Sequence, residues 1–122
     1  MKFALDPLEQ GYTIQAYTSE WIQIDEKKYH QSLLLMPAQI LQPWAITAVD
    51  QITTETLAEL AEFKPQILLI GTGKTQQFLP AKVFAPLISL GIGYEMMATG
   101  AACRTYDILL SEGRRVLAAL IL

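Results

Sequence analysis

The 122-residue chain is poor in cysteine, histidine and charge, and each shortage excludes a class of protein. A single Cys cannot form an intrachain disulfide framework, and with a single His it cannot build a Cys-rich or His-rich metal site. Charged residues make up 17% of the chain, against about 25% in an average domain. The formal net charge is −3, so the basic excess that nucleic-acid binding requires is missing.

Long apolar runs are also missing. No stretch reaches the roughly 18 residues that a membrane-spanning helix requires. The opening segment from Met1 to Pro7 is too short, and acidic too early, for a secretory signal. We therefore expect no transmembrane segment, no leader and a cytoplasmic location, which the low cysteine content also suits.

Apolar residues are what the chain has in excess, at 52%. A chain of this length buries about two-thirds of its unfolded surface around one core, so we expect residues 1–122 to form a single domain. Because few charges are available to cover the outside, we expect a homodimer or an obligate protein partner to hide apolar surface. The alternative is a monomer with a rich core and scattered exposed leucines.

The two halves of the chain differ in hydrophobic pattern. Short runs in the first half are typical of antiparallel strands; they cover residues 12–17, 21–24 and 32–36, with tight connections at 18–20 and 25–28. The second half predicts helices over 54–63, 80–90 and 99–111, and strands over 67–70, 92–96 and 116–121. Strand–helix–strand–helix–strand indicates crossover units on one sheet. The prediction is an α/β domain with a mixed sheet and antiparallel N-terminal strands.

Three local features refine the helices. Pro86 removes a backbone donor inside the second helix and predicts a kink or a late start. The same helix is expected to turn Val83, Phe84, Leu87 and Ile88 inward. Thr99 is expected to cap the third helix.

Two segments carrying glycines form the candidate binding site. If strands 67–70 and 92–96 are parallel neighbours, the segments that follow them meet at one rim of the sheet. The third helix then offers its first free N–H groups to an anion, with two cationic side chains within reach. The candidate ligand-binding residues are Gly71, Thr72, Gly73, Lys74, Thr99, Gly100 and Arg104.

These residues also have a purely structural interpretation. The glycines permit sharp turns, Thr99 caps a helix, and Arg104 pairs with an acidic neighbour, which would be Glu95, Asp107 or Glu112. Gln76 occupies the place of the third glycine in a dinucleotide-binding G-x-G-x-x-G motif, and the spacing of a phosphate-binding P-loop is also missing. The pattern therefore disfavours nucleotide cofactors.

Cys103 leaves two interpretations open. A helix N-terminus lowers the pKa of a thiol, which would favour a nucleophile. A pair with a base would require His30, in the first half of the chain, to reach it. The alternative is a small buried apolar residue beside Ala102.

Four blocks of the second half resemble a known family. They are residues 67–73, 91–97, 99–109 and 112–116, in that order and spacing, with a looser match through Gly11-Tyr12, Tyr29 and 32–37. The family consists of small α/β proteins of unknown biochemical activity. It includes bacterial proteins, a human protein associated with adipogenesis, and a mitochondrial assembly factor for respiratory complex I.

The resemblance implies a three-layer α/β fold with a central mixed sheet, no known cofactor and no established catalytic residues. For the mitochondrial members it implies a role in building a membrane enzyme through protein contacts. Two positions depart from the family pattern: Ala98 stands where members usually have an acidic residue, and Asp107 stands where Asn is usual. If the missing acidic group served a site, that site is degraded in this chain.

Two functions remain open at this stage. The first is a non-enzymatic binding or assembly-factor-like protein that acts through protein contacts. The second is an enzyme or small-molecule sensor that binds an anionic ligand at the rim between Gly71–Gly73 and Thr99–Arg104. The missing catalytic set and the low charge favour the first.

Overall fold

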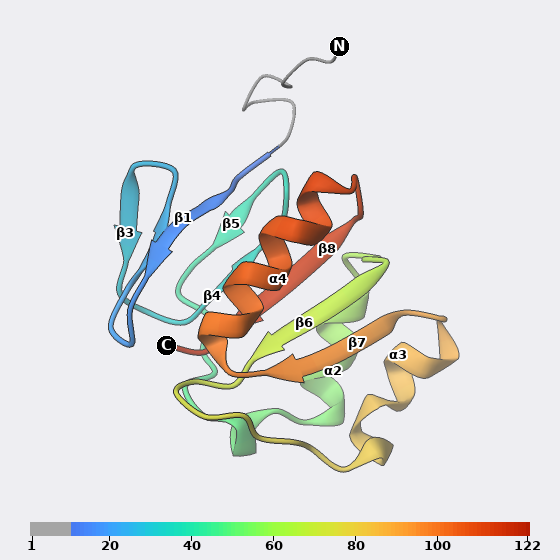
Figure 1. The fold of residues 1–122 in the computed structure, drawn as a ribbon. Helices are drawn as coiled ribbons and strands as arrows, with labels where there is room; N and C mark the ends of the chain where they lie inside the picture. The colour runs from blue at the N-terminus through green and yellow to red at the C-terminus, as the bar shows by residue number, and fades with distance from the viewer. Residues whose placement is uncertain (1–10) are drawn as a thin grey trace.

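The computed structural model describes residues 11–122, which form two β-sheets with helices packed around them (Figure 1). The smaller sheet is antiparallel and has the order β1–β2–β3; its strands are β1 (Ile14–Tyr17), β2 (Ile22–Ile24) and β3 (Lys27–Tyr29). The larger sheet has the order β5–β4–β8–β6–β7; its strands are β4 (Leu33–Leu35), β5 (Ile40–Leu41), β6 (Ile67–Gly71), β7 (Gly93–Met97) and β8 (Val116–Leu120). The helical elements are η1 (Val49–Gln51), α2 (Thr54–Ala61), η2 (Ala81–Phe84), α3 (Ala85–Ser89) and α4 (Thr99–Ser111).

The centre of the larger sheet is parallel, as the crossover pattern predicts. Strand β6 pairs in parallel with β7 on one side and with β8 on the other. Strand β8 also pairs antiparallel with β4, so the sheet is mixed. All five residues of β8 are buried apolar residues, which fits a strand covered on both faces.

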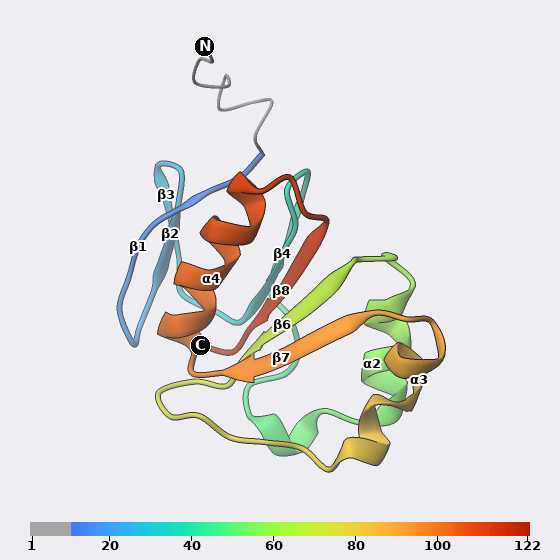
Figure 2. The same cartoon turned by 45° about the vertical axis from the view of Figure 1, so that its right-hand side comes forward.

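Helices cover both faces of this sheet and complete a three-layer α/β arrangement (Figure 2). On one face Leu68 and Ile70 of β6 pack with α2 and α3 through Leu57 and Leu87. On the other face Leu69 packs with the α4 residues Ala102, Cys103 and Tyr106. The alternation of neighbouring β6 residues between two cores is the period-2 rule of a strand.

The smaller sheet lies against α4 and is held there by polar contacts. The Tyr106 hydroxyl donates a hydrogen bond to the backbone carbonyl of Tyr12 over 3.0 Å. The backbone N–H of Ile14 donates to the Asp107 carboxylate, also over 3.0 Å. The first residue of β1 and Tyr12 just before the strand are therefore fixed to α4, although the two segments are far apart in the sequence.

Two local predictions were wrong. Residues 25–28 were expected to be a connection, but Lys27 and Lys28 belong to β3, because Asp25 takes a left-handed φ of +53° and shortens the turn. Ile88 was expected to face inward but is 58% exposed. The late helix start at Pro86 is confirmed: residues 81–84 form a 3-10 turn, and α3 begins only at Ala85.

Candidate functional site

The carboxyl ends of β6 and β7 bring the two glycine-bearing segments together, as predicted. The backbone N–H of Thr72 donates to the Met97 carbonyl over 2.8 Å. The N–H of Thr99 donates in turn to the Gly73 carbonyl over 2.9 Å. These two bonds continue the ladder beyond the strands and join the loop after β6 to the start of α4.

The Thr99 side chain does not cap α4, which corrects the prediction. The N-cap position is Ala98, and it has no side-chain cap. The Thr99 hydroxyl instead accepts a hydrogen bond from the Gly73 N–H over 2.8 Å and donates one to the Ile121 carbonyl over 2.7 Å. Thr99 is 6% exposed, so its hydroxyl provides a hydrogen-bond partner for two backbone groups that water reaches poorly.

Gly71 has a packing role at the same place. A Cβ atom built on Gly71 would lie 2.9 Å from the Thr99 hydroxyl and 3.0 Å from the Thr99 Cα, so a side chain does not fit. Gly73 needs glycine for another reason, because its φ is +96°. The two glycines therefore let the loop after β6 approach α4 and then turn away from it.

The loop after Gly73 is shaped by the hydroxyl of Thr72, which is buried. This hydroxyl donates to the Thr75 carbonyl over 2.6 Å and accepts from the Gln77 N–H over 3.2 Å. Farther along, the Gln76 amide donates to the Met96 carbonyl of β7 over 3.2 Å. The loop is thus fixed by the polar side chains of its own residues.

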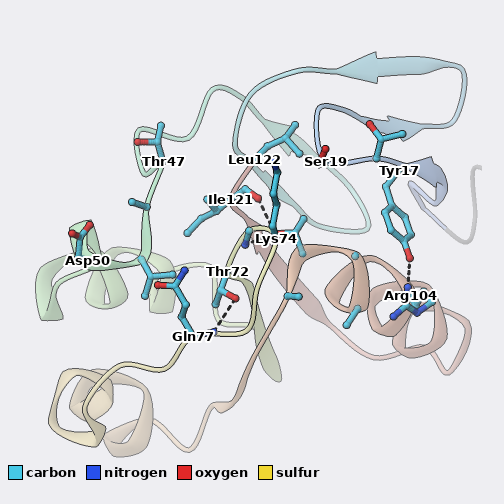
Figure 3. Close-up of a pocket in the computed structure, with 18 residues that line it drawn as sticks. Tyr17, Ser19, Thr47, Asp50, Thr72, Lys74, Gln77, Arg104, Ile121 and Leu122 are labelled. Atoms are coloured by element: carbon cyan, nitrogen blue, oxygen red, sulfur yellow. Dashed lines mark hydrogen bonds between the residues drawn. The ribbon is translucent and has the colours of Figure 1, made fainter.

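A cavity of about 680 Å³ opens above these two segments (Figure 3). Six of the seven predicted residues line it: Thr72, Gly73, Lys74, Thr99, Gly100 and Arg104. Gly71 is the exception, because it is buried beneath Thr99. The predicted rim therefore forms a real cavity. Nothing in the structure tests whether a ligand occupies it, and that part stays a prediction.

Arg104 lies on one side of the cavity and pairs with an aromatic residue instead of a carboxylate. Its guanidinium donates a hydrogen bond to the Tyr17 hydroxyl (Figure 3). The expected pairs with Glu95, Asp107 or Glu112 are not formed; within residues 11–122 the ion pair joins Arg114 to Glu112, at 4.0 Å. The reason is that β1 packs across α4 and presents Tyr17 to Arg104.

Gly100 makes this approach of Tyr17 to α4 sterically possible. A Cβ atom on Gly100 would lie 2.7 Å from the Tyr17 ring. The ring therefore lies against the first turn of α4 at Gly100. The N–H groups of Gly100 and Ala101 in this turn have no intrahelical acceptor, and both residues line the cavity. Together with Lys74 and Arg104, these donors make one side of the cavity attractive to an anion.

The opposite side of the cavity was not predicted from the sequence. Thr47 and Asp50 line it from the segment around η1, and Gln77 lies next to them (Figure 3). Ile121 and Leu122 contribute from the strand end after β8. No local motif marks these residues, because only the packing of separate segments brings them to the rim. Asp50 places one negative charge on the side of the cavity opposite Arg104 (Figure 3).

Cys103 is a core residue, which confirms the second of its two interpretations. It is 1% exposed. Burial, with the nearby Asp107 carboxylate as a second cause, raises the pKa of the thiol to about 12, although Arg104 acts in the opposite direction. The thiol is therefore protonated and inaccessible at neutral pH, which disfavours a nucleophile.

Asp107 is the half-buried carboxylate of this region. Burial raises its pKa above the ordinary value, and the hydrogen bond from the Ile14 N–H opposes that shift. The neighbouring Tyr106 also has a raised pKa, because its phenol is buried and lies near Asp107. Both groups hold β1 on α4 and neither lines the cavity.

A family comparison matches most of the described chain. Residues 14–121 fit the model of a family described as "Protein of unknown function (DUF498/DUF598)". The chain belongs to this family. The resemblance drawn from the four sequence blocks is thereby confirmed, and the relatives of the chain include proteins named as NADH dehydrogenase assembly factors.

Individual DUF498/DUF598 relatives carry different names. The chain is 34% identical over 113 residues to NADH dehydrogenase [ubiquinone] 1 alpha subcomplex assembly factor 3 of Danio rerio, covering 91% of this chain and 64% of that protein. It is 31% identical over 90 residues to a 13 kDa major membrane protein of Francisella tularensis, covering 73% of each. A solution structure of a Bordetella pertussis protein with a Mth938-like domain superimposes with a TM-score of 0.80 at 32% identity, covering 99% of this chain and 92% of that one.

The chain covers different shares of the length of its relatives. The chain spans 59–64% of the length of the assembly-factor relatives, so those proteins contain further sequence that this chain does not match. The superposition on the Mth938-like domain confirms the α/β fold over nearly the whole chain.

The described residues show neither a metal-binding cluster nor a membrane-spanning helix. Between residues 11 and 122, no cluster of three or more His, Cys, Asp or Glu side chains has the arrangement of a metal site. No helix in the same part of the chain has both the length and the apolar character needed to cross a bilayer.

Proposed function

We propose that this chain is an assembly-factor-like protein that acts by binding other proteins and not by catalysis. The observation that carries the proposal is the match with assembly factor 3 relatives, which extends over 88–92% of this chain at 29–34% identity. The cavity supports it, because the lining defined by residues 11–122 contains neither His nor Cys, the usual partners in nucleophilic catalysis. Cys103, the one thiol, is buried in the core.

The partner is a second copy of the chain or another protein. Exposed apolar side chains support such a contact: Phe78 is 72% exposed, Leu90 is 65% exposed and Ile88 is 58% exposed. Analytical ultracentrifugation at micromolar concentration distinguishes the two arrangements. A homodimer sediments at twice the 13.6 kDa of the chain, whereas a protein that needs a different partner sediments as the single chain.

The assembly role is tested in the native organism. The tagged chain, expressed from its own locus, is cross-linked in cells and purified, and the captured proteins are identified by mass spectrometry. We expect subunits of a multi-subunit enzyme, and we expect less of that assembled enzyme on native gels when the gene is deleted. An unchanged level of every assembled complex would contradict the proposal. Cell fractionation in the same strain checks the predicted cytoplasmic location.

A second candidate function is the binding of a small anionic molecule at the cavity. Its supporting observation is the cavity itself, since about 680 Å³ lies within the range of about 300–1,000 Å³ for ligand sites, and Lys74 and Arg104 both line it. Screening anions by thermal shift tests it, because a ligand at 100 times its Kd stabilises the fold by about 2.7 kcal/mol. Loss of the shift in Lys74→Ala and Arg104→Ala would support this function, whereas unchanged shifts would remove it.

A further inference from the structure

The end of the sheet opposite the cavity carries two hollows that share part of their lining. The first, of about 330 Å³, is lined by residues 36–39, 63–65 and 115–117. The second, of about 500 Å³, is lined by Ala58, Ala61, Glu62, Lys64, Pro65, Leu90, Ile92 and Arg115. Because Lys64, Pro65 and Arg115 line both, the two hollows are adjacent. We call the combined surface the amino-end groove, since it lies where β6 and β8 begin.

Apolar side chains form the walls and floor of the amino-end groove. Val116 and Leu117 are buried beneath the first hollow, and Phe63 stands at its side with 39% of its surface exposed. In the second hollow Ile92 is nearly buried, whereas Leu90 is 65% exposed. The groove therefore has two apolar ends, each with one large exposed side chain that a partner can contact.

Two cations divide these apolar ends. Lys64 follows α2 in a left-handed conformation with φ of +54°, and its N–H donates to the Ala61 carbonyl over 2.9 Å. This turn brings the Lys64 backbone to Arg115, whose Nε donates to the Lys64 carbonyl over 3.5 Å. The two basic residues are therefore fixed side by side through the backbone, and both side chains are exposed.

The charge of the groove is unbalanced. None of the described residues that line the first hollow is acidic, and Glu62 lines only the second. The neighbouring Arg114 is engaged by Glu112 at 4.0 Å, and within residues 11–122 no carboxylate lies that close to Lys64 or Arg115. In a chain with a net charge of −3, this is a local positive site between apolar surfaces.

We propose that the amino-end groove binds a segment of a partner protein that presents one carboxylate between two apolar side chains. The carboxylate would lie against Lys64 and Arg115, and the apolar side chains would lie against Phe63 and Leu90. Charge complementarity selects an acidic partner, and the separation of the two hollows selects a segment with an apolar residue on each side of the acid. The inference rests on the proposed function, because it assigns the protein contact to a definite surface.

A random twelve-residue peptide library displayed on phage, selected against the full-length protein, tests the proposal directly. We expect the enriched peptides to share an Asp or Glu between two apolar residues. For the best synthetic peptide, replacement of that acid by Asn or Gln should weaken binding at least tenfold, measured by fluorescence polarisation. Enriched peptides without an acid, or no enrichment, would overturn the proposal.

Charge reversal locates the peptide on the protein. The double variant Lys64→Glu/Arg115→Glu should lose the acidic peptide and bind a version in which Lys replaces the acid. The single variants Phe63→Ser and Leu90→Ser should each weaken binding about tenfold. Lys82→Glu and Ile108→Ser are the matched controls, because they make the same chemical changes at exposed positions outside the groove, and they should leave binding unchanged.

Circular dichroism and thermal melting of every variant establish that the fold is intact, and the charge-swapped peptide gives a positive signal that an unfolded variant cannot produce. Peptide binding that survives Lys64→Glu/Arg115→Glu overturns the proposal, as does self-association that this variant abolishes, since a second copy would then be the occupant. These outcomes are independent of the assembly test: a peptide that binds the groove while no assembled complex changes on gene deletion would remove the proposed function and retain the groove.

Discussion

The two ends of the β6–β8 pair differ in how closely the backbone is packed. At the carboxyl end, the Thr99 hydroxyl joins the Gly73 N–H to the Ile121 carbonyl, and Gly71 leaves no room for a Cβ atom. At the amino end, the Gln66 N–H donates to the Arg115 carbonyl and the Gln66 side-chain oxygen accepts from the Arg115 N–H, both over 2.8 Å. A Cβ atom built on Gly93, where β7 begins, would lie 3.6 Å from its nearest neighbour, the Gln66 carbonyl oxygen. Both ends are thus held by directional bonds, but of the two the carboxyl end has backbone contacts too close for a Cβ atom, whereas the amino end leaves room for one.

This difference separates two kinds of surface. Directional hydrogen bonds fix the backbone around the cavity, as a small-molecule site requires. An exposed aromatic side chain and an arginine that line the same hollow, as Phe63 and Arg115 do, are typical of surfaces that contact another protein. The difference makes definite predictions about which substitutions each end tolerates.

The largest effect on the free energy of unfolding is expected from Thr99→Val. This change keeps the shape of the side chain but leaves the Gly73 N–H and the Ile121 carbonyl without their partner, so the free energy of unfolding should fall by about 2–3 kcal/mol. Urea unfolding measures it. Thr99→Ser, which retains the hydroxyl, should recover most of the loss. A small loss in Thr99→Val together with a larger loss in Thr99→Ser would show that the methyl group, and not the hydroxyl, closes this end.

Paired glycine substitutions compare the two ends of the sheet directly. Gly71→Ala should lower the free energy of unfolding by about 1–3 kcal/mol, because its new Cβ would lie 3.0 Å from the Thr99 backbone. Gly93→Ala is the matched control, with its nearest contact at 3.6 Å and no left-handed φ, and should change stability by less than about 0.5 kcal/mol. Similar losses at both positions would remove the distinction between the ends.

The smallest effect on stability is expected from Asp107→Asn, in the region between the two ends, and it depends on pH. Because burial raises the pKa of this carboxyl in the folded state, the folded protein holds the proton more tightly than the unfolded chain does. Stability should therefore fall as the pH rises from the ordinary aspartate pKa through the raised folded value. Asn keeps an acceptor for the Ile14 N–H and should remove this fall, whereas Glu59→Gln on the exposed side of α2 should retain it. Urea titrations across this pH range measure the difference.

The elements of the second half of the chain were largely predictable from local sequence. The run from Ile67 to Ile70 has the unbroken apolar pattern of a doubly covered strand, and the structure buries it between α4 on one face and α2 with α3 on the other. Pro86 predicts the late start of α3 because a missing N–H has a local effect. The parallel pairing of β6 and β7 then follows from the crossover and brings six of the seven predicted residues to the cavity.

The remainder depends on contacts that no local pattern contains. Tyr17 and Arg104 are 87 positions apart, and only the packing of β1 across α4 makes them partners. The same holds for Thr99. Its position at the start of α4 does not indicate that its hydroxyl donates a hydrogen bond to the Ile121 carbonyl. Ile88 was misplaced because the 3-10 turn before α3 shifts which residues of a five-residue helix face inward.

The Gln76 amide has a consequence for the solubility of the protein. Strand β7 ends the larger sheet, and since Gly93 turns its N–H toward β6, the Met96 carbonyl points out from the open side. By donating to that carbonyl, Gln76 occupies an acceptor that a strand of another molecule would need for growth of the sheet. The exposed charge of Glu95 opposes the same event. The loop after Gly73, which lines the cavity, therefore also disfavours edge-to-edge aggregation through Gln76.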